Sequence, residues 1–116
     1  MFGMNIKEID ATTLKNWIAE GKALRLVDVR TPAEMNRGMI EGGVALPMHM
    51  VPINPPRPEG DETLVIYCRS GARSAQVCAY LAQQFGTEAY NLQGGVIAWA
   101  SIGESLITPE AGIMAG

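Results

Sequence analysis

The chain has 116 residues, of which 47% are apolar and 18% charged, and this composition is typical of one globular domain with its own core rather than of a disordered chain. Its formal net charge of −3 argues against nucleic-acid binding. Every Lys and Arg lies at or before Arg73, so any basic surface must come from the first two-thirds of the chain.

The two cysteines, Cys68 and Cys78, do not form a disulfide framework. The N-terminus lacks the charged and apolar regions of a signal peptide, and no apolar run approaches the roughly 18 residues that span a bilayer. We therefore expect a cytoplasmic protein without a membrane partner, in which the reducing surroundings keep Cys68 free.

Strand and helix signals alternate along the chain. A first strand over 5–9, at a sheet edge, precedes a helix that Asp10 or Thr12 can cap. The apolar face of this helix consists of Leu14, Trp17 and Ile18, and Gly21 is placed to end it.

A buried strand over 24–29 is followed by a short helix, with Thr31 as N-cap and Pro32 at its first position. Residues 38–43 form a turn, and 44–46 form the next strand. The proline-rich stretch 50–61 reads as an irregular connection.

The second half of the chain begins with a central strand over 63–67. A helix is predicted over 72–85, and Gly86 ends it. Its apolar face has helical spacing and contains Ala75, Cys78, Leu81, Ala82 and Phe85. A strand over 88–92 and a last helix from Gly94-Gly95 to Gly103 complete the pattern.

This alternation predicts an α/β fold with a mainly parallel, five-stranded central sheet between helices. We expect a single domain over 1–116, with its core at about 6–103. The tail over 104–116 shows no periodicity and is expected to be loosely held. In such sheets, ligands bind beyond the carboxyl ends of the strands.

Cys68 stands at such an end, directly after the strand 63–67. Gly71 allows a tight turn in which backbone N–H groups face the sulfur, and the helix that begins at about Ala72 adds its positive end. Arg69 and Arg73 supply permanent positive charge, while Ser70 and Ser74 can donate hydrogen bonds. These are the conditions that lower a thiol pKa and bind an anion, so Cys68 is predicted to be a nucleophile rather than a structural cysteine.

Asp28 ends the neighbouring buried strand and lies in a charged cluster with Arg30 and Glu34. We expect Asp28 to pair with Arg73 and to support the shape of the Cys68 loop without touching substrate. The alternative is a surface aspartate.

Other candidate residues have weaker signals. Cys78 shares a helical face with apolar residues and reads as core, with a resolving role as the alternative. His49 is the only histidine, so neither a metal site nor a Cys–His dyad is supported. Met48 and Met50 beside it are either filler residues or the rim of a site.

Three motifs together resemble the rhodanese family of sulfurtransferases, and the resemblance runs from about residue 6 to 103. The motifs are the stretches 26–30, Glu34 and 38–43; the loop 68–74; and 91–95 followed by Trp99. Two positions depart from the family pattern: Met39 stands where the family usually has His, and Gly43 where it usually has Ala. Both positions are expected to support the fold.

The resemblance implies a three-layer rhodanese-like sandwich and a thiosulfate sulfurtransferase activity that needs neither a metal nor an organic cofactor. The Cys68 thiolate would take sulfur from thiosulfate or a persulfide and pass it to cyanide, a thiol or a small sulfur-carrier protein. The substrate-binding loop would contain Arg69, Ser70, Gly71, Ala72, Arg73 and Ser74.

Two other functions stay open. A phosphatase or arsenate reductase would place its arginine six residues after the cysteine, whereas Arg73 is one residue earlier and Ser74 occupies the sixth place. A sulfur-relay or interaction module would carry the persulfide only to partner proteins.

Overall fold

Strands and helices alternate along the chain as the sequence predicts. The computed structural model describes residues 6–108. The strands are β1 (Lys7–Ile9), β2 (Leu24–Asp28), β3 (Gly43–Ala45), β4 (Thr63–Tyr67) and β5 (Tyr90–Leu92). The helices are α1 (Ala11–Ala19), α2 (Pro32–Asn36), α3 (Ala72–Phe85), α4 (Gly95–Ser101) and the 3-10 turn η1 (Met48–Met50).

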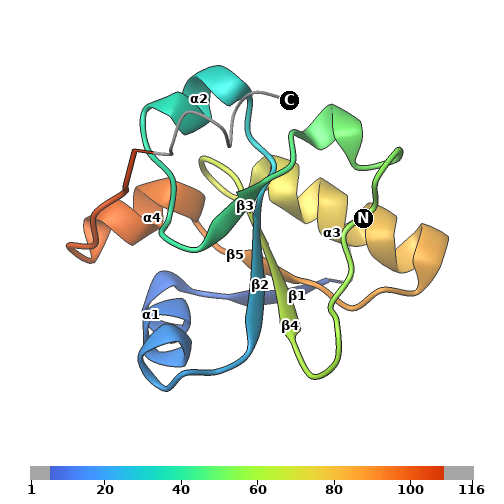
Figure 1. The fold of residues 1–116 in the computed structure, drawn as a ribbon, viewed down its shortest axis with the longest axis horizontal. Helices are drawn as coiled ribbons and strands as arrows, with labels where there is room; N and C mark the ends of the chain where they lie inside the picture. Colours follow the sequence, from blue (N-terminus) through green and yellow to red (C-terminus); the bar gives the residue numbers. More distant parts are fainter. Residues whose placement is uncertain (1–5, 109–116) are drawn as a thin grey trace.

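The five strands form one parallel sheet in the order β1-β5-β4-β2-β3, with β4 in the centre and β1 at an edge. In Figure 1, α1 and α4 cover one face of this sheet and α3 covers the other, which gives the three layers of the predicted sandwich. Asp28 and Tyr67 are the last residues of β2 and β4 and lie side by side in the parallel register, so both strands end at the same level of the sheet. Helix α2 lies beyond these carboxyl ends.

Alternation along β4 divides its side chains between two cores. Val65 and Tyr67 pack with Leu14 of α1 and Trp99 of α4. Leu64 and Ile66 face α3, and Cys68 continues this second set. Because side chains alternate along a strand, the residue that follows Tyr67 points toward α3.

Cap signals in the sequence fix the helix ends. Asp10 is the N-cap of α1 and accepts a hydrogen bond from the Thr13 N–H, which decides between the two predicted caps. Thr31 and Glu34 form a capping box around Pro32 at the start of α2, as the predicted N-cap requires. Helix α3 has the predicted bounds, and Gly86 ends it with φ of 65°.

Three predicted core positions are wrong. Ile18 is 43% exposed, Phe85 is 50% exposed and Ala82 is exposed, although all three share helical spacing with buried residues. Each lies in the last turn of its helix. The Phe85 ring packs edge-on against Tyr80 instead.

Residues 104–108 differ from the loosely held tail that the sequence predicts. The N–H and carbonyl groups of Met39 and Ile107 form an antiparallel bridge, with N–O distances of 2.7 and 2.8 Å. Leu106 packs against the α1–α4 core, and Glu104 pairs with Lys15. This part of the tail is therefore tied to the fold, while 109–116 lie outside the described residues.

The two departures from the rhodanese pattern fit the structure locally. Met39 is 2% exposed and contributes to the core. A Cβ at Gly43 would lie 2.9 Å from the Tyr67 hydroxyl, and this hydroxyl accepts a hydrogen bond from the Ile40 N–H. Glycine at 43 therefore leaves room for the tyrosine.

Candidate active site

Cys68 lies at the carboxyl end of the central strand and is only 1% exposed. The turn after it returns the chain to the sulfur, because Gly71 adopts φ of 102° before α3 begins. The N–H groups of Gly71 and Ser74 lie 3.1 and 3.4 Å from Sγ, and the Ser74 hydroxyl lies 3.3 Å from it. The convergence of N–H groups expected from the sequence is thus present.

These hydrogen bonds change the acidity of the thiol. Burial by itself raises the pKa of Cys68, but hydrogen bonds from the Ser74 hydroxyl and from the N–H groups of Ser74, Gly71 and Ser70 outweigh it. The net effect is a pKa below the ordinary value for cysteine. A buried thiol with such donors is prepared to become a thiolate.

The N-terminus of helix α4 binds the backbone of the Cys68 loop. The Val96 N–H donates to the Cys68 carbonyl at 3.0 Å, and the Ile97 N–H donates to the Arg69 carbonyl at 3.2 Å. The free N–H groups at the start of this helix therefore fix the backbone on which the nucleophile stands. The 91–95 motif marked this region, but the sequence did not predict its contact with the Cys68 loop.

The expected pair between Asp28 and Arg73 is wrong. Asp28 pairs instead with Arg30, whose Nε lies 3.0 Å from Oδ1 and whose Nη2 lies 2.7 Å from Oδ2. In the strand register Asp28 stands beside Tyr67 and so points to the α1–α4 face, whereas Arg73 belongs to α3 on the other face. Asp28 therefore forms its ion pair within the first motif and not with the Cys68 loop, and Arg30 also donates to the Gly38 carbonyl.

The partner of Arg73 is Glu34 of α2, and both ends of the guanidinium bind its carboxylate, at 2.7 and 2.9 Å. The Arg73 hydrogen bond is the main cause that lowers the pKa of Glu34 to about 2, against the smaller opposing effect of burial. This pair joins the first motif to the Cys68 loop. Glu34 stood in the predicted charged cluster, but nothing in the sequence pointed to Arg73 as its partner.

The model of the Rhodanese-like domain matches residues 10–102. The chain belongs to the rhodanese family.

Several relatives of this rhodanese-like chain are named sulfurtransferases. It is 49% identical to a sulfurtransferase of Allochromatium vinosum over 90% of this chain and 98% of that protein. It is 30% identical to the thiosulfate sulfurtransferase GlpE of Shewanella oneidensis, over 71% and 81%. The crystal structure of a rhodanese-like domain protein from Staphylococcus aureus matches with a TM-score of 0.79 at 36% identity, covering 90% of this chain and all of that one. Sulfur transfer is thus supported as the general function.

The remaining residues of the rhodanese-like loop face outward. Arg69, Ser70 and Ala72 are exposed, and Arg69 takes part in none of the ion pairs among residues 6–108. The guanidinium of Arg69 is therefore available to an anion approaching the loop, unlike that of Arg73.

His49 and Met48 lie on η1. His49 is exposed, and no hydrogen bond among the described residues joins it to Cys68. Met48 packs against the core between the sheet and α3, which agrees with a filler methionine. Residues 6–108 contain no group of three or more His, Cys, Asp and Glu placed to hold a metal ion.

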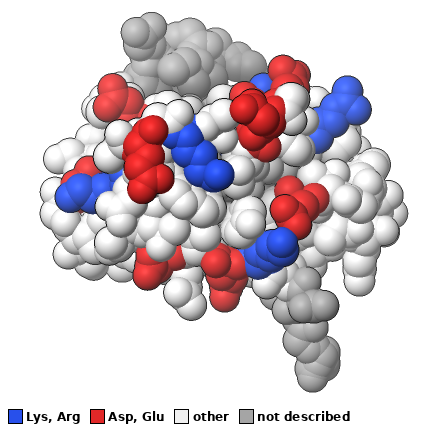
Figure 2. Space-filling model, turned by 90° about the horizontal axis from the view of Figure 1, so that it is seen from below, with Lys and Arg blue, Asp and Glu red and all other residues white. Residues whose placement is uncertain are grey.

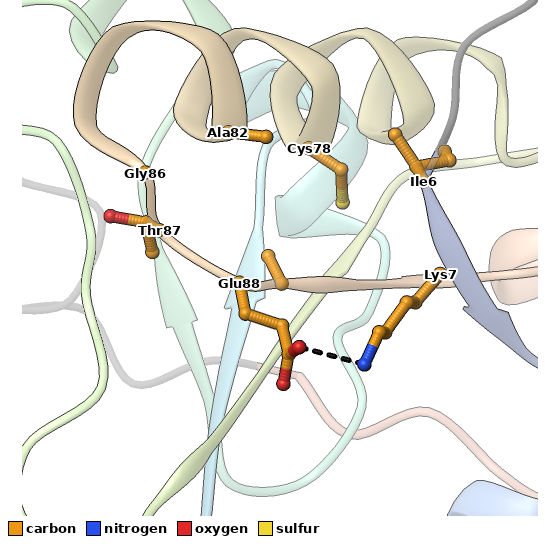
Figure 3. A pocket seen from close by; sticks show the side chains of 8 residues that line it. Ile6, Lys7, Cys78, Ala82, Gly86, Thr87 and Glu88 are labelled. Carbon is orange, nitrogen blue, oxygen red and sulfur yellow. Dashed lines mark ion pairs between the residues drawn. The ribbon is translucent and has the colours of Figure 1, made fainter.

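Cys78 lies away from the loop, one helical turn farther along α3. Figure 3 shows it on a pocket of about 250 Å³, whose rim carries an ion pair of 2.7 Å between Lys7 and Glu88. Cys78 is 2% exposed, and burial raises its pKa to about 12, with smaller contributions from the charges of Glu8 and Cys68. This thiol is a core residue, as predicted.

The surface charges are mixed. On the face seen in Figure 2, blue Lys and Arg side chains alternate with red Asp and Glu side chains, with no broad patch of one sign.

Within the described residues, every helix is too short or too polar to cross a membrane.

Proposed function

We propose that the protein is a sulfurtransferase in which Cys68 carries the transferred sulfur as a persulfide, with thiosulfate or a persulfide as the donor. The observation that carries this proposal is the set of donors around Sγ: two N–H groups and one hydroxyl, all within 3.4 Å. The sulfurtransferase relatives point to the same chemistry.

In the first half-reaction the Cys68 thiolate attacks the outer sulfur of thiosulfate. A bond forms between Sγ and that sulfur, the sulfur–sulfur bond of thiosulfate breaks, and sulfite leaves with the electron pair. One negative charge remains on the terminal persulfide sulfur. The exposed Arg69 attracts the dianionic donor, and the positive end of α3 offsets the charge beside the loop.

In the second half-reaction an acceptor attacks the terminal sulfur, and Sγ leaves as a thiolate. Cyanide would give thiocyanate, and a thiolate would give a new persulfide. The hydrogen bonds from Gly71 and Ser74 stabilise the charge that returns to Sγ. Neither step requires a general base, because the nucleophile already carries its charge.

The phosphatase alternative fits the loop less well. A phosphatase arginine must be free to bind the equatorial oxygens of phosphate, but Arg73 is held at both ends by Glu34. The sixth residue after the cysteine is Ser74, which is buried and bound to Sγ. A relay role differs from the proposed function only in the acceptor, which would be a protein.

The test is the intact mass of the protein after incubation with thiosulfate. We expect a gain of one sulfur, about 32 Da, that cyanide removes. Cys68→Ser should gain nothing, and the matched control Cys78→Ser should behave as the native protein does.

The acceptor is tested on the same samples. Loading by thiosulfate and release to cyanide would establish turnover with small molecules, whereas loading without release to cyanide or small thiols would favour the relay role. Absence of loading by thiosulfate and by low-molecular-weight persulfides would overturn the proposed function.

A further inference from the structure

A chain of hydrogen bonds runs from Cys68 through the buried Ser74 and Asn91 to Glu8 on the edge strand of the sheet. Behind the sulfur, the Ser74 hydroxyl makes a short hydrogen bond with Oδ1 of Asn91 on β5. The Asn91 Nδ2 lies 2.9 Å from Oε2 of Glu8 on β1 and 3.2 Å from the Gly71 carbonyl oxygen. Ser74 and Asn91 are at most 1% exposed, so water does not reach the hydrogen bond between them.

The two partners of the Asn91 amide fix its orientation. The Glu8 carboxylate and the Gly71 carbonyl are both acceptors, so the NH₂ group must face them. Oδ1 then faces Ser74 and can only accept. A flip of the amide would set its oxygen against two other oxygens.

The Ser74 hydroxyl therefore has one proton and two neighbours that can accept it. When Cys68 is a neutral thiol, its S–H can donate to Ser74 Oγ while Ser74 donates to Asn91 Oδ1, and every group is satisfied. When Cys68 is a thiolate, the same proton serves either Sγ or Oδ1. The other acceptor is left without it in a buried place, which is costly.

We propose that Asn91 is a positioning residue that competes with Cys68 for the single proton of the Ser74 hydroxyl. Glu8 and the Gly71 carbonyl hold the Asn91 amide in the orientation that makes it a competitor. The sequence marked Asn91 only as the first residue of a motif, and it gave no indication of Glu8.

The competition gives Ser74 a different partner at different stages of the proposed sulfur transfer, on which this part of the inference rests. In the persulfide the charge lies on the terminal sulfur, so Sγ is a weak hydrogen-bond acceptor. The Ser74 hydroxyl then donates to Asn91. As an acceptor removes the terminal sulfur, charge returns to Sγ and draws the proton back. The hydroxyl thus stabilises Sγ most strongly when Sγ is the leaving group.

Three other titratable groups lie close enough to affect the Cys68 thiol or its hydrogen-bond chain. Arg73 and Cys78 of α3 interact electrostatically with Cys68, and Glu8 of β1 lies behind Asn91. None of them contacts the Ser74 hydroxyl. Substitution of Asn91 by an uncharged residue therefore changes the proton competition and leaves these charges in place.

The test is the pKa of the Cys68 thiol, read from the pH dependence of its alkylation by iodoacetamide, with peptide masses to separate Cys68 from Cys78. Asn91→Ala removes the competitor, so we expect the thiol pKa to fall by about one unit. Ser74→Ala removes the donor, so the pKa should rise. In Ser74→Ala/Asn91→Ala the effect of Asn91 should vanish.

The direction of the shift separates this role from a structural one. If Asn91 only kept the loop in shape, its loss would weaken the N–H donors and raise the thiol pKa. A rise in Asn91→Ala, or a fall that persists in the Ser74→Ala background, would overturn the proposal. The assay contains no sulfur donor, so its outcome is independent of whether Cys68 forms a persulfide.

Asn91→Leu tests the same competition if Asn91→Ala does not fold, because leucine fills about the same space and has no acceptor. We expect the same fall in the thiol pKa, and Ser74→Ala should abolish it. Glu8→Gln is the control, since glutamine can still accept from Asn91 Nδ2 through its carbonyl oxygen and the Gly71 carbonyl still holds the amide in place. An equal fall in Glu8→Gln and Asn91→Leu would show that charge, not the proton of Ser74, sets the thiol pKa and would overturn the proposal.

Discussion

The Arg73 guanidinium binds both carboxylate oxygens of Glu34 and thereby ties the Cys68 loop to α2. The two residues are 39 positions apart, and their side chains are 34% and 23% exposed. A two-point pair of this kind restricts the first turn of α3, whose N–H groups face the sulfur.

Glu34→Gln isolates this pair, because glutamine can still complete the capping box with Thr31. We expect a loss of about 1–2 kcal/mol in the free energy of unfolding, since the pair is two-pointed but partly exposed. Persulfide formation should slow by roughly three- to tenfold as the loop loses order. Urea unfolding and the time course of mass gain measure the two effects.

Glu62→Gln is the matched control. It removes a carboxylate that pairs with Arg25, in a partly exposed pair at the opposite end of β2. We expect a smaller loss of stability than in Glu34→Gln and an unchanged rate of persulfide formation. Equal effects of the two variants would show that the Arg73 pair contributes nothing particular to the loop.

Acid should weaken the same contact. The Glu34 carboxyl has a pKa of about 2 in the folded protein against an ordinary value of 4.5, with the Arg73 hydrogen bond as the main cause. A lowered folded-state pKa means that the stabilisation is fully present above the unfolded-state pKa and is lost as the pH falls from about 4.5 toward 2.

Urea unfolding at about pH 6, pH 4 and pH 3 measures this loss. The native protein should lose stability more steeply over this interval than Glu34→Gln, which has no carboxyl to protonate at this position. Parallel curves for the two proteins would contradict the assigned cause of the lowered pKa.

Asp28→Asn should destabilise the whole fold rather than the loop alone. Asp28 is fully buried, and its partner Arg30 is 4% exposed. Loss of one member of a buried ion pair leaves the other charge uncompensated, which costs about 3–5 kcal/mol in the free energy of unfolding. Urea unfolding measures the loss.

Asp28→Leu/Arg30→Met removes both charges of this pair. It should be less destabilised than Asp28→Asn, because no uncompensated charge stays buried. If the double variant had a lower free energy of unfolding than Asp28→Asn, the hydrogen bond from Arg30 to the Gly38 carbonyl would outweigh the cost of burying the ion pair.

The sequence predicted most of the fold because local signals decide most of its elements. Thr31-Pro32 begins α2, and Gly71 and Gly86 bound α3 at the predicted residues. The last strand is shorter than the predicted range 88–92, since only Tyr90–Leu92 pair with neighbours. Helical spacing shows which face of a helix is apolar, but tertiary packing decides how much of that face is covered. Spacing alone therefore placed Phe85 in the core, although it is exposed.

The Cys68 loop could be predicted because its donors come from residues within six positions of the sulfur. The partners of the loop could not. Whether Asp28 points toward Arg73 depends on the register that pairs it with Tyr67, and one position of slip would reverse it. Contacts from Asn91 and Glu8 depend on the order of strands in the sheet, which local patterns do not encode.

The contact between α4 and the loop leads to a last prediction, at Gly95. This residue has φ of +55°, and a Cβ there would overlap the carbonyl oxygens of Cys68 and Arg69. Gly103 also has a positive φ, of +87°, but a Cβ there would meet nothing within 4 Å. Gly103→Ala therefore carries only the backbone strain, about 1–2 kcal/mol.

Gly95→Ala carries the same strain and must also push the loop away from the N-terminus of α4. We expect it to lose more stability in urea than Gly103→Ala and to form the persulfide more slowly, because Val96 and Ile97 would release the loop carbonyls. Gly103→Ala should keep the native rate. If both variants lost the same stability and kept the native rate, the close approach of α4 would have no part in shaping the Cys68 loop, and the donors around Sγ would have to be held by α3 alone.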